Sequence, residues 1–313
     1  MFSIGIDIGG MSIKAGLVDV DGFIVKKITA VTPKTVEQGV SVIVNLINEL
    51  LEKTSTNISQ VVGIGIGCPG AVDSKAGEII DLPNLGWVKY PLAKDLEKVF
   101  GIKVVLSNDA NVAVLAEAIY GVAKDYPNVI MFTLGTGVGG GMVLDGKLIE
   151  GGWSRGAELG HATLVLDGLP CTCGRNGCIE RYVSATALIE QTKREMIKNP
   201  KSAMWAYTKD CIDGVDGKTA FECSKLGDES AIKVVDTYVK YLSESILSML
   251  NIFRPEAFVL GGGICNQGDY LIDKVVDYCE KFEYGYPASP KTKILVASLG
   301  NDAGIVGAAA LIK

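Results

Sequence analysis

Two stretches of this 313-residue chain, residues 4–22 and 129–146, repeat the same order of features. In each, an apolar segment leads into a glycine-rich turn, a second apolar segment follows, and an Asp-Gly pair closes the stretch. Asp-Gly favours a hairpin because both of its positions accept a positive φ at little cost. The repeat predicts two related halves that each begin with a hairpin. Such halves would face each other across a cleft, where ligands commonly bind.

The rest of the chain alternates short runs rich in Val and Ile with segments of helical periodicity, which is typical of an α/β fold. Strands are predicted at residues 2–8, 13–18, 23–28, 61–67, 103–106, 129–134, 141–144, 258–260 and 293–297. Helices are predicted at residues 37–53, 111–120, 185–198, 229–252 and 304–312.

Composition narrows the class of protein. A chain of 313 residues that is 48% hydrophobic buries a large core and is expected to hold two domains. The net charge of −6, with acids and bases interleaved, argues against a nucleic-acid partner. The longest uncharged stretches, residues 54–72 and 126–144, are interrupted by glycines and polar residues, which argues against a membrane span. With no leader at the N-terminus, we expect a soluble cytoplasmic protein.

The chain has one histidine, His161, and Cys171, Cys173 and Cys178 follow it closely. One imidazole and three thiolates complete a tetrahedral zinc site. Because protein would fill all four positions, the metal is predicted to be structural rather than hydrolytic. Two carboxylates, Glu158 before the histidine and Glu180 after the last cysteine, are tethered to the same metal from opposite ends.

Disulfides or free thiols are the alternative interpretation of these cysteines. The other five cysteines are scattered singly, which fits a reducing compartment better than a disulfide framework. A redox role usually shows two cysteines separated by two residues, whereas Cys171 and Cys173 are separated by one. Zinc is therefore the favoured prediction.

The turn after the first predicted strand reads Asp-Ile-Gly-Gly-Met-Ser-Ile-Lys, residues 7–14. Glycines let backbone N–H groups approach an anion closely. An acidic side chain in such a turn is unfavourable beside phosphate unless a cation intervenes, so Asp7 implies Mg²⁺ and a nucleoside triphosphate. The candidate ligands here are Asp7, Gly9, Gly10, Ser12 and Lys14.

Two further glycine turns lie at strand ends. A glycine run alone most often marks a tight turn, but three of them at strand ends together favour nucleotide binding. The second turn covers residues 135–141 and is a candidate for the other phosphates, and the third covers residues 261–263 and suits a nucleoside. The candidate residues are Gly135, Thr136, Gly137, Gly261, Gly262 and Gly263.

Asn108 and Asp109 follow an apolar strand and precede a helix. The plainer interpretation of Asp109 is a helix cap. A strand end in an open α/β sheet also faces the ligand crevice, and a helix N-terminus keeps a carboxylate ionised. An ionised aspartate there can take the proton of an attacking hydroxyl, as phosphoryl transfer requires.

Together these residues resemble the ROK family of sugar kinases and sugar-responsive repressors, and most of all its glucokinases. The likeness extends over essentially the whole chain and rests on residues 7–14, 67–72, 83–87, 108–111, 135–139, 158–161, 171–180 and 261–263. The glutamate, histidine and cysteine signature of residues 158–180 is the most specific part.

The resemblance implies the actin-like, ribonuclease-H-like ATPase fold, with two βββαβα lobes around a cleft. We expect an N-terminal lobe of residues 1–120 joined by a C-terminal helix, residues 301–313. The second lobe, residues 121–300, would carry the zinc motif. A homodimer is also implied, because dimers are common in the family.

The resemblance further implies an ATP-dependent hexose kinase that converts glucose to glucose 6-phosphate. Asp109 would be the general base toward the sugar 6-hydroxyl. The other hydroxyls would be bound by Asn108, Glu158, His161 and Glu180, with Gly70 and Asn84 as further candidates. One ring nitrogen of His161 would bind zinc while the other bonds a hydroxyl.

Met11 departs from the family pattern, because it stands where a threonine hydroxyl usually meets a phosphate. A thioether cannot donate that hydrogen bond, and the neighbouring Ser12 is the candidate replacement. Two alternative functions stay open: an N-acetylmannosamine or fructose kinase, and a non-catalytic sugar sensor. Repressors of the family carry a DNA-binding domain ahead of the first glycine turn, and Asp7 lies too near the N-terminus to leave room for one.

Overall fold

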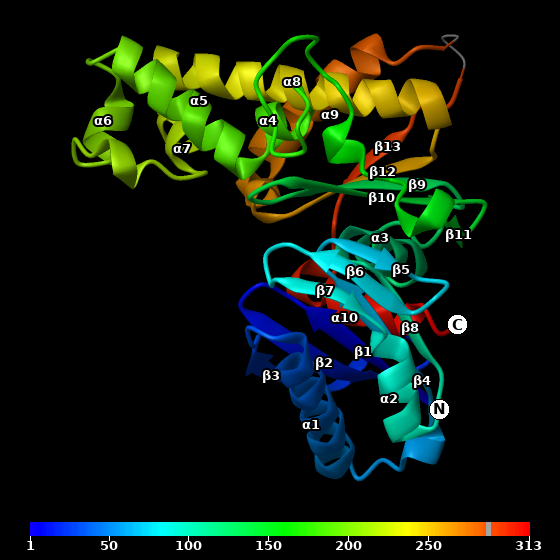
Figure 1. Cartoon of the computed structure of the whole chain (residues 1–313). Helices are drawn as coiled ribbons and strands as arrows, with labels where there is room; N and C mark the ends of the chain where they lie inside the picture. Colours follow the sequence, from blue (N-terminus) through cyan, green and yellow to red (C-terminus); the bar gives the residue numbers. More distant parts are fainter. Residues whose placement is uncertain (286–288) are drawn as a thin grey trace. The chain divides into compact units, whose positions relative to one another are not determined.

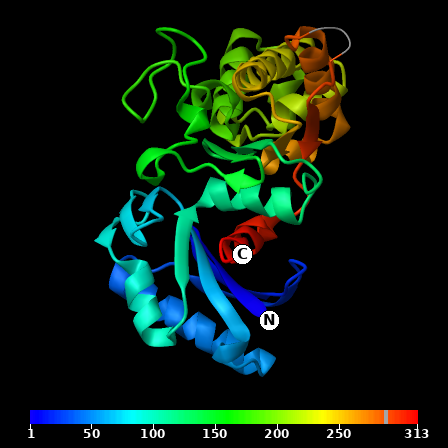
Figure 2. The same ribbon diagram turned by 90° about the vertical axis from the view of Figure 1, so that its right-hand side faces the viewer.

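The computed structural model describes residues 1–285 and 289–313, which form the α/β architecture that the sequence predicts (Figures 1 and 2). The described chain forms two compact units. The first unit comprises Met1–Ile130, Gly141–Ala157 and Ala297–Lys313, and the second comprises Met131–Gly140 and Glu158–Val296. None of the helices among the described residues has the length and hydrophobicity of a membrane span.

The first five-stranded sheet has the order β3-β2-β1-β4-β8. Strand β2 is antiparallel to both β1 and β3, whereas β4 is parallel to β1 and β8 is parallel to β4. The bounds are β1 (Phe2–Ile8), β2 (Ser12–Val18), β3 (Ile24–Val31), β4 (Val61–Cys68) and β8 (Val104–Asn108). The carboxyl ends of β1, β4 and β8 therefore meet at one edge of the sheet.

The second sheet repeats this order as β11-β10-β9-β12-β13, which confirms the predicted duplication. Its strands are β9 (Val129–Leu134), β10 (Val138–Leu144), β11 (Lys147–Leu148), β12 (Ala257–Gly261) and β13 (Lys293–Val296). Asp145 and Gly146, with φ of 50° and 71°, form the two-residue turn between β10 and β11. The other Asp-Gly pair lies in a longer turn, where Gly22 has a φ of 86°.

Strands β9 and β10 contribute residues to both compact units. The lobe boundaries expected above place both strands wholly in the second lobe and stay a prediction. One expectation about β10 was wrong: the glycines of residues 139–141 belong to the strand, which begins at Val138. The second glycine turn is therefore shorter than predicted and consists of Gly135, Thr136 and Gly137.

The two faces of the first sheet are covered in different ways. On one face, Ile4, Ile6 and their neighbours pack against α1 (Val36–Thr54) and α2 (Leu92–Phe100) in a fully buried cluster. On the other face, α10 (Ala303–Ala310) lies against glycines of β1 and β4, beside α3 (Asp109–Ile119) (Figure 2). A Cβ atom on Gly5 or Gly65 would overlap a carbonyl oxygen of α10.

In the second unit, the long helix α8 packs against α4, α5, α7 and α9 (Figure 1). The helices are α4 (Glu180–Val183), α5 (Ala185–Lys198), α6 (Ala203–Tyr207), α7 (Thr219–Lys225), α8 (Glu229–Phe253) and α9 (Asp269–Phe282). Short 3₁₀ helices are η1 (Ile58–Gln60), η2 (Gly152–Ser154), η3 (Leu159–His161), η4 (Ile212–Gly214), η5 (Gly263–Gln267) and η6 (Gly300–Asp302).

All predicted helices and strands are present, with bounds shifted by at most three residues. The sequence analysis missed a small antiparallel sheet of β5 (Ala71–Asp73), β6 (Glu78–Leu82) and β7 (Trp87–Tyr90). It also missed β11 and the helices α2, α4, α6, α7 and α9. Strands of two to five residues contain too few positions for an alternating pattern to be recognised.

The close approach of α10 yields a stability prediction. In Gly65→Ala, the new Cβ overlaps the Ala308 carbonyl oxygen, so the helix must move away from the sheet. We expect a loss of about 1–3 kcal/mol in the free energy of unfolding, as for other overpacked cores. Gly152→Ala is the matched control, because a Cβ there meets no atom within 4 Å. Equal denaturation midpoints for the two variants would contradict this packing.

Candidate active site and metal centre

The predicted zinc ligands lie together in the second unit. One ligand atom from each of His161, Cys171, Cys173 and Cys178 falls within 4.8 Å of all the others. The Sγ atom of Cys171 is 3.6 Å from His161 Nδ1, and the Sγ atoms of Cys173 and Cys178 are 3.6 Å apart. Ligands at zinc bond lengths of about 2.0–2.3 Å around a tetrahedron lie roughly 3.3–3.8 Å from one another. These two ligand pairs have that spacing, and one imidazole with three thiols is a donor set that zinc binds, so the residues fit zinc.

Backbone hydrogen bonds shape this cluster. The Cys171 N–H donates to the Arg175 carbonyl at 2.8 Å, and the Gly174 N–H donates to the Cys171 carbonyl at 3.0 Å. Burial raises the pKa of the Cys178 thiol to about 12, and a backbone hydrogen bond from Arg175 lowers the pKa of Cys173. Because thiolates are the ligands, zinc binding would release the thiol protons.

Glu180 begins α4 and links the metal cluster to the second glycine turn. Its Oε2 atom accepts a hydrogen bond from the Val138 N–H at 3.0 Å, and its Oε1 atom lies 3.9 Å from Cys171 Sγ. A Cβ on Gly137 would overlap the Glu180 carboxylate, which would then have to move from its place. The turn is also tied to the start of α5, because the Ala185 N–H donates to the Gly135 carbonyl at 2.8 Å. A displacement of the metal cluster would therefore also displace Glu180 and this turn.

The remaining sugar candidates of the second unit lie at η3, which begins immediately after Glu158. Glu158 is exposed and His161 is half-buried. The Nδ1 atom of His161 faces Cys171, which would leave Nε2 for a hydroxyl. Gly160 between them touches β10 so closely that a Cβ would overlap the Val138 carbonyl.

The first glycine turn connects β1 to β2 in the first unit. The Gly9 N–H donates to the Ser12 carbonyl at 2.9 Å, while the Gly9 carbonyl accepts from Thr32 Oγ1 at 2.6 Å. Met11 is 88% exposed at the tip of the turn, and Gly10 beside it has open space around its Cα. Asp7 and Lys14 form an ion pair of 3.0 Å, so one carboxylate and one ammonium group stand together at the base of the turn.

Asp109 lies at the same sheet edge as Asp7. The thiol of Cys68, at the end of β4, is fully buried, and its pKa is raised by that burial and by the negative charges of Asp109 and Asp7. Both carboxylates are therefore close to one residue. Asn108, rather than Asp109, is the N-cap of α3, since its Oδ1 accepts from the Ala110 N–H at 2.8 Å. Asp109 is the exposed first residue of the helix. The interpretation of Asp109 as the cap was therefore wrong, because the residue before it is the N-cap.

The remaining candidates for sugar or nucleoside binding are Gly70, Asn84 and the third glycine turn. Gly70, with a φ of 122°, accepts a hydrogen bond from Asn108 Nδ2 at 3.2 Å, so it lies beside the sheet edge that carries Asp109. Asn84 is exposed in the turn between β6 and β7. Gly262, in the third glycine turn, has a φ of 98° and abuts the Leu134 carbonyl, and its neighbours Gly261 and Gly263 end β12 and begin η5.

Sequence reasoning missed a carboxylate that organises this edge of the first unit, Glu150. Its Oε1 atom accepts from Ser107 Oγ at 2.5 Å, and its Oε2 atom accepts from Ser74 Oγ at 2.7 Å. The Ser74 and Ser154 hydroxyl oxygens are 2.6 Å apart. Because Glu150 accepts the Ser74 proton, Ser154 must donate to Ser74. This chain of hydrogen bonds fixes Ser107, the residue before Asn108 and Asp109.

The hydrogen bonds of Glu150, Ser74 and Ser154 also hold a strained loop. Trp153, Ser154 and Ala157 have φ values of 54°, 55° and 61°, which cost non-glycine residues free energy and persist only where other contacts enforce them. The loop continues directly into Glu158. No periodicity or motif marks Glu150 or the serines, and only the unusual Glu-Gly-Gly-Trp-Ser run could have drawn attention to this segment.

The Glu150 contacts yield a second prediction. Glu150→Ala leaves the fully buried Ser107 hydroxyl without its charged acceptor. Each hydrogen bond to a charged group is worth about 1.5–3 kcal/mol, so we expect unfolding free energy to fall by at least that amount. Glu78→Ala, at an exposed position of β6, is the control and is expected to change it by less than about 0.5 kcal/mol. Similar unfolding curves for both variants would show that the hydrogen bonds of Glu150 do not stabilise the fold.

The metal cluster leads to a third prediction, about zinc content and sugar binding. Protein purified without chelator is expected to hold one zinc ion per chain by elemental analysis, and Cys178→Ser to hold much less. Because Glu180 is tied to the cluster, the variant is expected to lose sugar binding while nucleotide binding changes little. A displacement of about 1 Å in a positioning group can cost on the order of 10²-fold in rate. Cys211→Ser, at an exposed cysteine outside the cluster, is the control. Normal sugar kinetics in zinc-free protein would show that the metal stabilises the fold without positioning the sugar-binding residues.

Several known proteins are similar to this chain over nearly its whole length. The family model described as ROK family matches residues 3–313. A glucokinase of Thermotoga maritima is 38% identical over 99% of this chain and 96% of its own length. A glucokinase of Streptomyces coelicolor is 35% identical over 99% and 97%. The structure of a ROK family glucokinase from Streptomyces griseus, in complex with glucose and AMPPNP, is 34% identical over 99% of both chains, with a TM-score of 0.81.

The structural match over the whole chain confirms the expected actin-like fold. With a family model that covers residues 3–313 and full-length relatives above 30% identity, the chain belongs to the ROK family.

Proposed function

We propose that this protein is an ATP-dependent glucokinase that transfers the γ-phosphoryl group of ATP to the 6-hydroxyl of glucose, giving glucose 6-phosphate and ADP. The full-length similarity to glucokinases supports it. The observation that carries the proposal is Asp109, an exposed carboxylate at the first turn of α3 and at the end of β8. That position suits a base which takes a hydroxyl proton.

Asp109 would accept the 6-hydroxyl proton as the oxygen attacks the γ-phosphorus. The α3 N-terminus favours its ionised form, and the Ala110 N–H, which Asp109 Oδ1 shares with Asn108 Oδ1 at 2.8 Å each, helps to fix its orientation. Asn108 is held by this shared bond and by Gly70, so its amide presents a fixed polar surface next to the base. Asn84 would supply a further hydroxyl contact from the β6–β7 turn.

Binding of ATP would use the three glycine turns. Gly9, Gly10 and Ser12 offer backbone and hydroxyl groups to phosphate, and Lys14 offers an ammonium group. Gly135, Thr136 and Gly137 form a second phosphate turn, while residues 261–263 would accommodate the nucleoside. Asp7 is the residue that would hold Mg²⁺, whose chemical contribution is to offset the phosphate charge. Because Met11 stands at the tip of the first turn, that turn would bind phosphate without a hydroxyl there.

Sugar hydroxyls would be bound by Glu158, His161 and Glu180. The two carboxylates accept hydrogen bonds from hydroxyl groups, whereas the Nε2–H of a histidine whose Nδ1 binds zinc donates one. Such a matched set of acceptors and a donor discriminates strongly among sugars. Zinc bound to His161 and the cysteines would keep Glu180 and the imidazole in place without acting on the substrate. Glucose as the preferred hexose rests on the similarity to glucokinases. A homodimer and a cytoplasmic location stay predictions.

Asp109→Asn tests the proposal, because an amide of nearly the same shape cannot accept the proton. We expect kcat for glucose to fall by about 10²-fold to 10⁴-fold. Glucose affinity by calorimetry and the unfolding midpoint should stay close to wild type. ADP release would be measured across glucose, fructose and N-acetylmannosamine, with glucose expected to give the highest kcat/KM. Near-normal turnover of the variant would show that Asp109 is not the base.

A further inference from the structure

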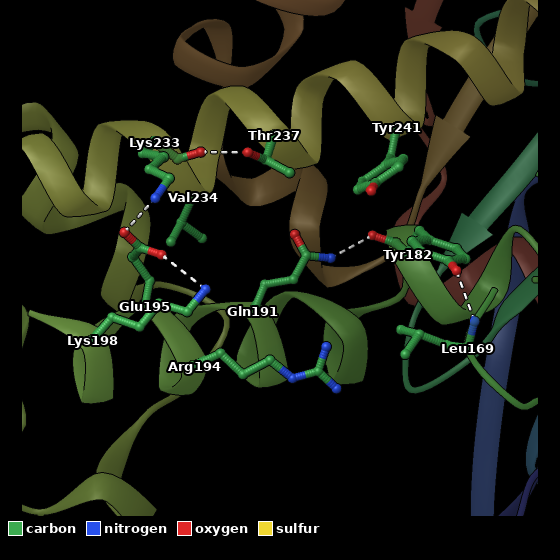
Figure 3. A pocket seen from close by; sticks show the side chains of 10 residues that line it. All are labelled: Leu169, Tyr182, Gln191, Arg194, Glu195, Lys198, Lys233, Val234, Thr237 and Tyr241. Carbon is green, nitrogen blue, oxygen red and sulfur yellow. Dashed lines mark hydrogen bonds and ion pairs between the residues drawn. The ribbon is translucent and has the colours of Figure 1, made fainter. Parts of the chain in front are cut away.

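A cavity of about 320 Å³ lies wholly within the second unit, among α4, α5, α8 and Leu169 (Figure 3). Cavities of this volume are at the lower end of those that bind small molecules. At one end the rings of Tyr182 and Tyr241 lie 4.8 Å apart, and Val234 adds an apolar wall from α8. None of the residues assigned above to ATP, sugar or metal lines it. The cavity is therefore separate from the proposed catalytic residues.

Gln191 gives this cavity an unmet hydrogen-bond requirement. Its Nε2 atom donates to the Tyr182 carbonyl at 2.8 Å, and because a carbonyl can only accept, the amide oxygen must face the other way. Figure 3 shows this oxygen directed toward the cavity. Among residues 1–285 and 289–313 nothing donates to Gln191 Oε1, although the atom is buried. A buried acceptor without a donor is costly, so a ligand that carries a hydroxyl group would be favoured here.

Charged side chains around the cavity favour an anion. Arg194, Lys198 and Lys233 line it with a single carboxylate, Glu195, which bonds Lys233 at 2.9 Å. Arg194 is more than half exposed, and its nearest carboxylate, Glu190, is 3.7 Å away and is also paired with Arg181. A loosely paired guanidinium group is well suited to bind phosphate or carboxylate.

Three hydrogen bonds connect the cavity wall to the proposed sugar site. Tyr182 belongs to α4, the helix that begins with Glu180, and its carbonyl is held by Gln191. Its hydroxyl accepts from the Leu169 N–H at 2.8 Å, and the Leu169 carbonyl accepts from the Gly177 N–H beside Cys178. A donor on Gln191 Oε1 would polarise the amide and strengthen its bond to Tyr182. Occupancy would thus hold α4 and Glu180 more firmly.

We propose that this cavity binds a small hydroxylated anion, a sugar phosphate or a hydroxy acid, and that its occupancy tightens glucose binding through α4. The hydroxyl groups would bond Gln191 Oε1, the carbon skeleton would pack on the two tyrosine rings, and the anionic group would face Arg194. The binding part stands on the cavity alone, whereas the effect on glucose rests on the proposed glucokinase function.

Calorimetric titration of the whole protein at saturating glucose would test binding. The probes are fructose 6-phosphate, citrate and inorganic phosphate. We expect one of the two organic anions to bind at least ~10-fold more tightly than inorganic phosphate, and which one binds identifies the class. Equal affinity for inorganic phosphate, or no saturable binding of either organic anion at millimolar concentration, would overturn the proposal. The titration needs no turnover, so its result is independent of whether the protein phosphorylates glucose.

Matched variants assign the binding to the cavity. Thr237→Phe fills the cavity from an exposed position of α8, and Thr237→Val is its isosteric control. Arg194→Gln removes the guanidinium group, and Lys201→Gln removes an exposed cation that does not line the cavity. Thr237→Phe and Arg194→Gln are expected to lower affinity at least ~10-fold and the two controls less than about threefold. Unchanged affinity in Thr237→Phe would place the ligand elsewhere and refute the site.

Glucose kinetics test the coupling. The bound anion is expected to lower the KM for glucose at least about fivefold in wild type and in Thr237→Val, within the usual range of allosteric coupling. It should have no effect in Thr237→Phe, and kcat should change little. Binding without any change in KM would overturn the coupling to α4. A protein that binds the anion but phosphorylates no glucose would instead refute the proposed function.

Discussion

Backbone-to-backbone packing of α10 on the first sheet is the contact on which the sheet edge with Asp7 and Asp109 depends. Gly5 and Gly65 let the helix approach two strands at a distance that no side chain allows, and Gly307 lets α3 approach α10 in the same way. The carboxyl ends of β1 and β4 and the start of α3 are thereby fixed against one helix. Asp7, Cys68 and Asp109 lie close together as a result of this packing.

A buried carboxylate reinforces the same junction. Glu117 of α3 is fully buried and accepts hydrogen bonds from the Val122 N–H, the Leu299 N–H and the Ser298 hydroxyl. It thus joins the end of α3 to the segment that leads into α10. In the second unit a metal bound by His161 and the three cysteines would have the corresponding role. The segment from Glu158 to Glu180 contains only a short 3₁₀ turn and isolated β-bridges, so four metal ligands would supply the order that a packed core supplies elsewhere.

Much of the fold could be predicted because its signals are local. Periodicity gave the long helices, apolar runs gave the sheet strands, and Asp-Gly pairs marked the repeated hairpins. The candidate metal ligands were recognisable because histidine is unique in the chain and three cysteines follow it closely. The three glycine turns and the Asn108–Asp109 pair were recognisable from their positions at strand ends.

The parts that could not be predicted depend on contacts between distant residues. Glu150 looks like any surface glutamate in the sequence, and its role exists only because Ser74, Ser107 and Ser154 converge on it in space. The cavity beside Gln191 likewise requires two helices and a loop to be placed. The strands β5, β6 and β7 are too short for an alternating pattern to be recognised. The first half of β10 was predicted as a turn because it consists largely of glycine.

The first unit is assembled from three separate pieces of chain, and this affects the order in which the protein folds. Its last piece, Ala297–Lys313, includes α10, and Lys313 Nζ reaches back to the Val20 carbonyl across 293 positions. Until α10 has left the ribosome, the glycine face of β1 and β4 has no helix to cover it. Residues 158–296, by contrast, have all been synthesised before α10 begins. We therefore expect the second unit to become protected first during synthesis, and the N-terminal strands to stay dependent on chaperones until translation has passed α10.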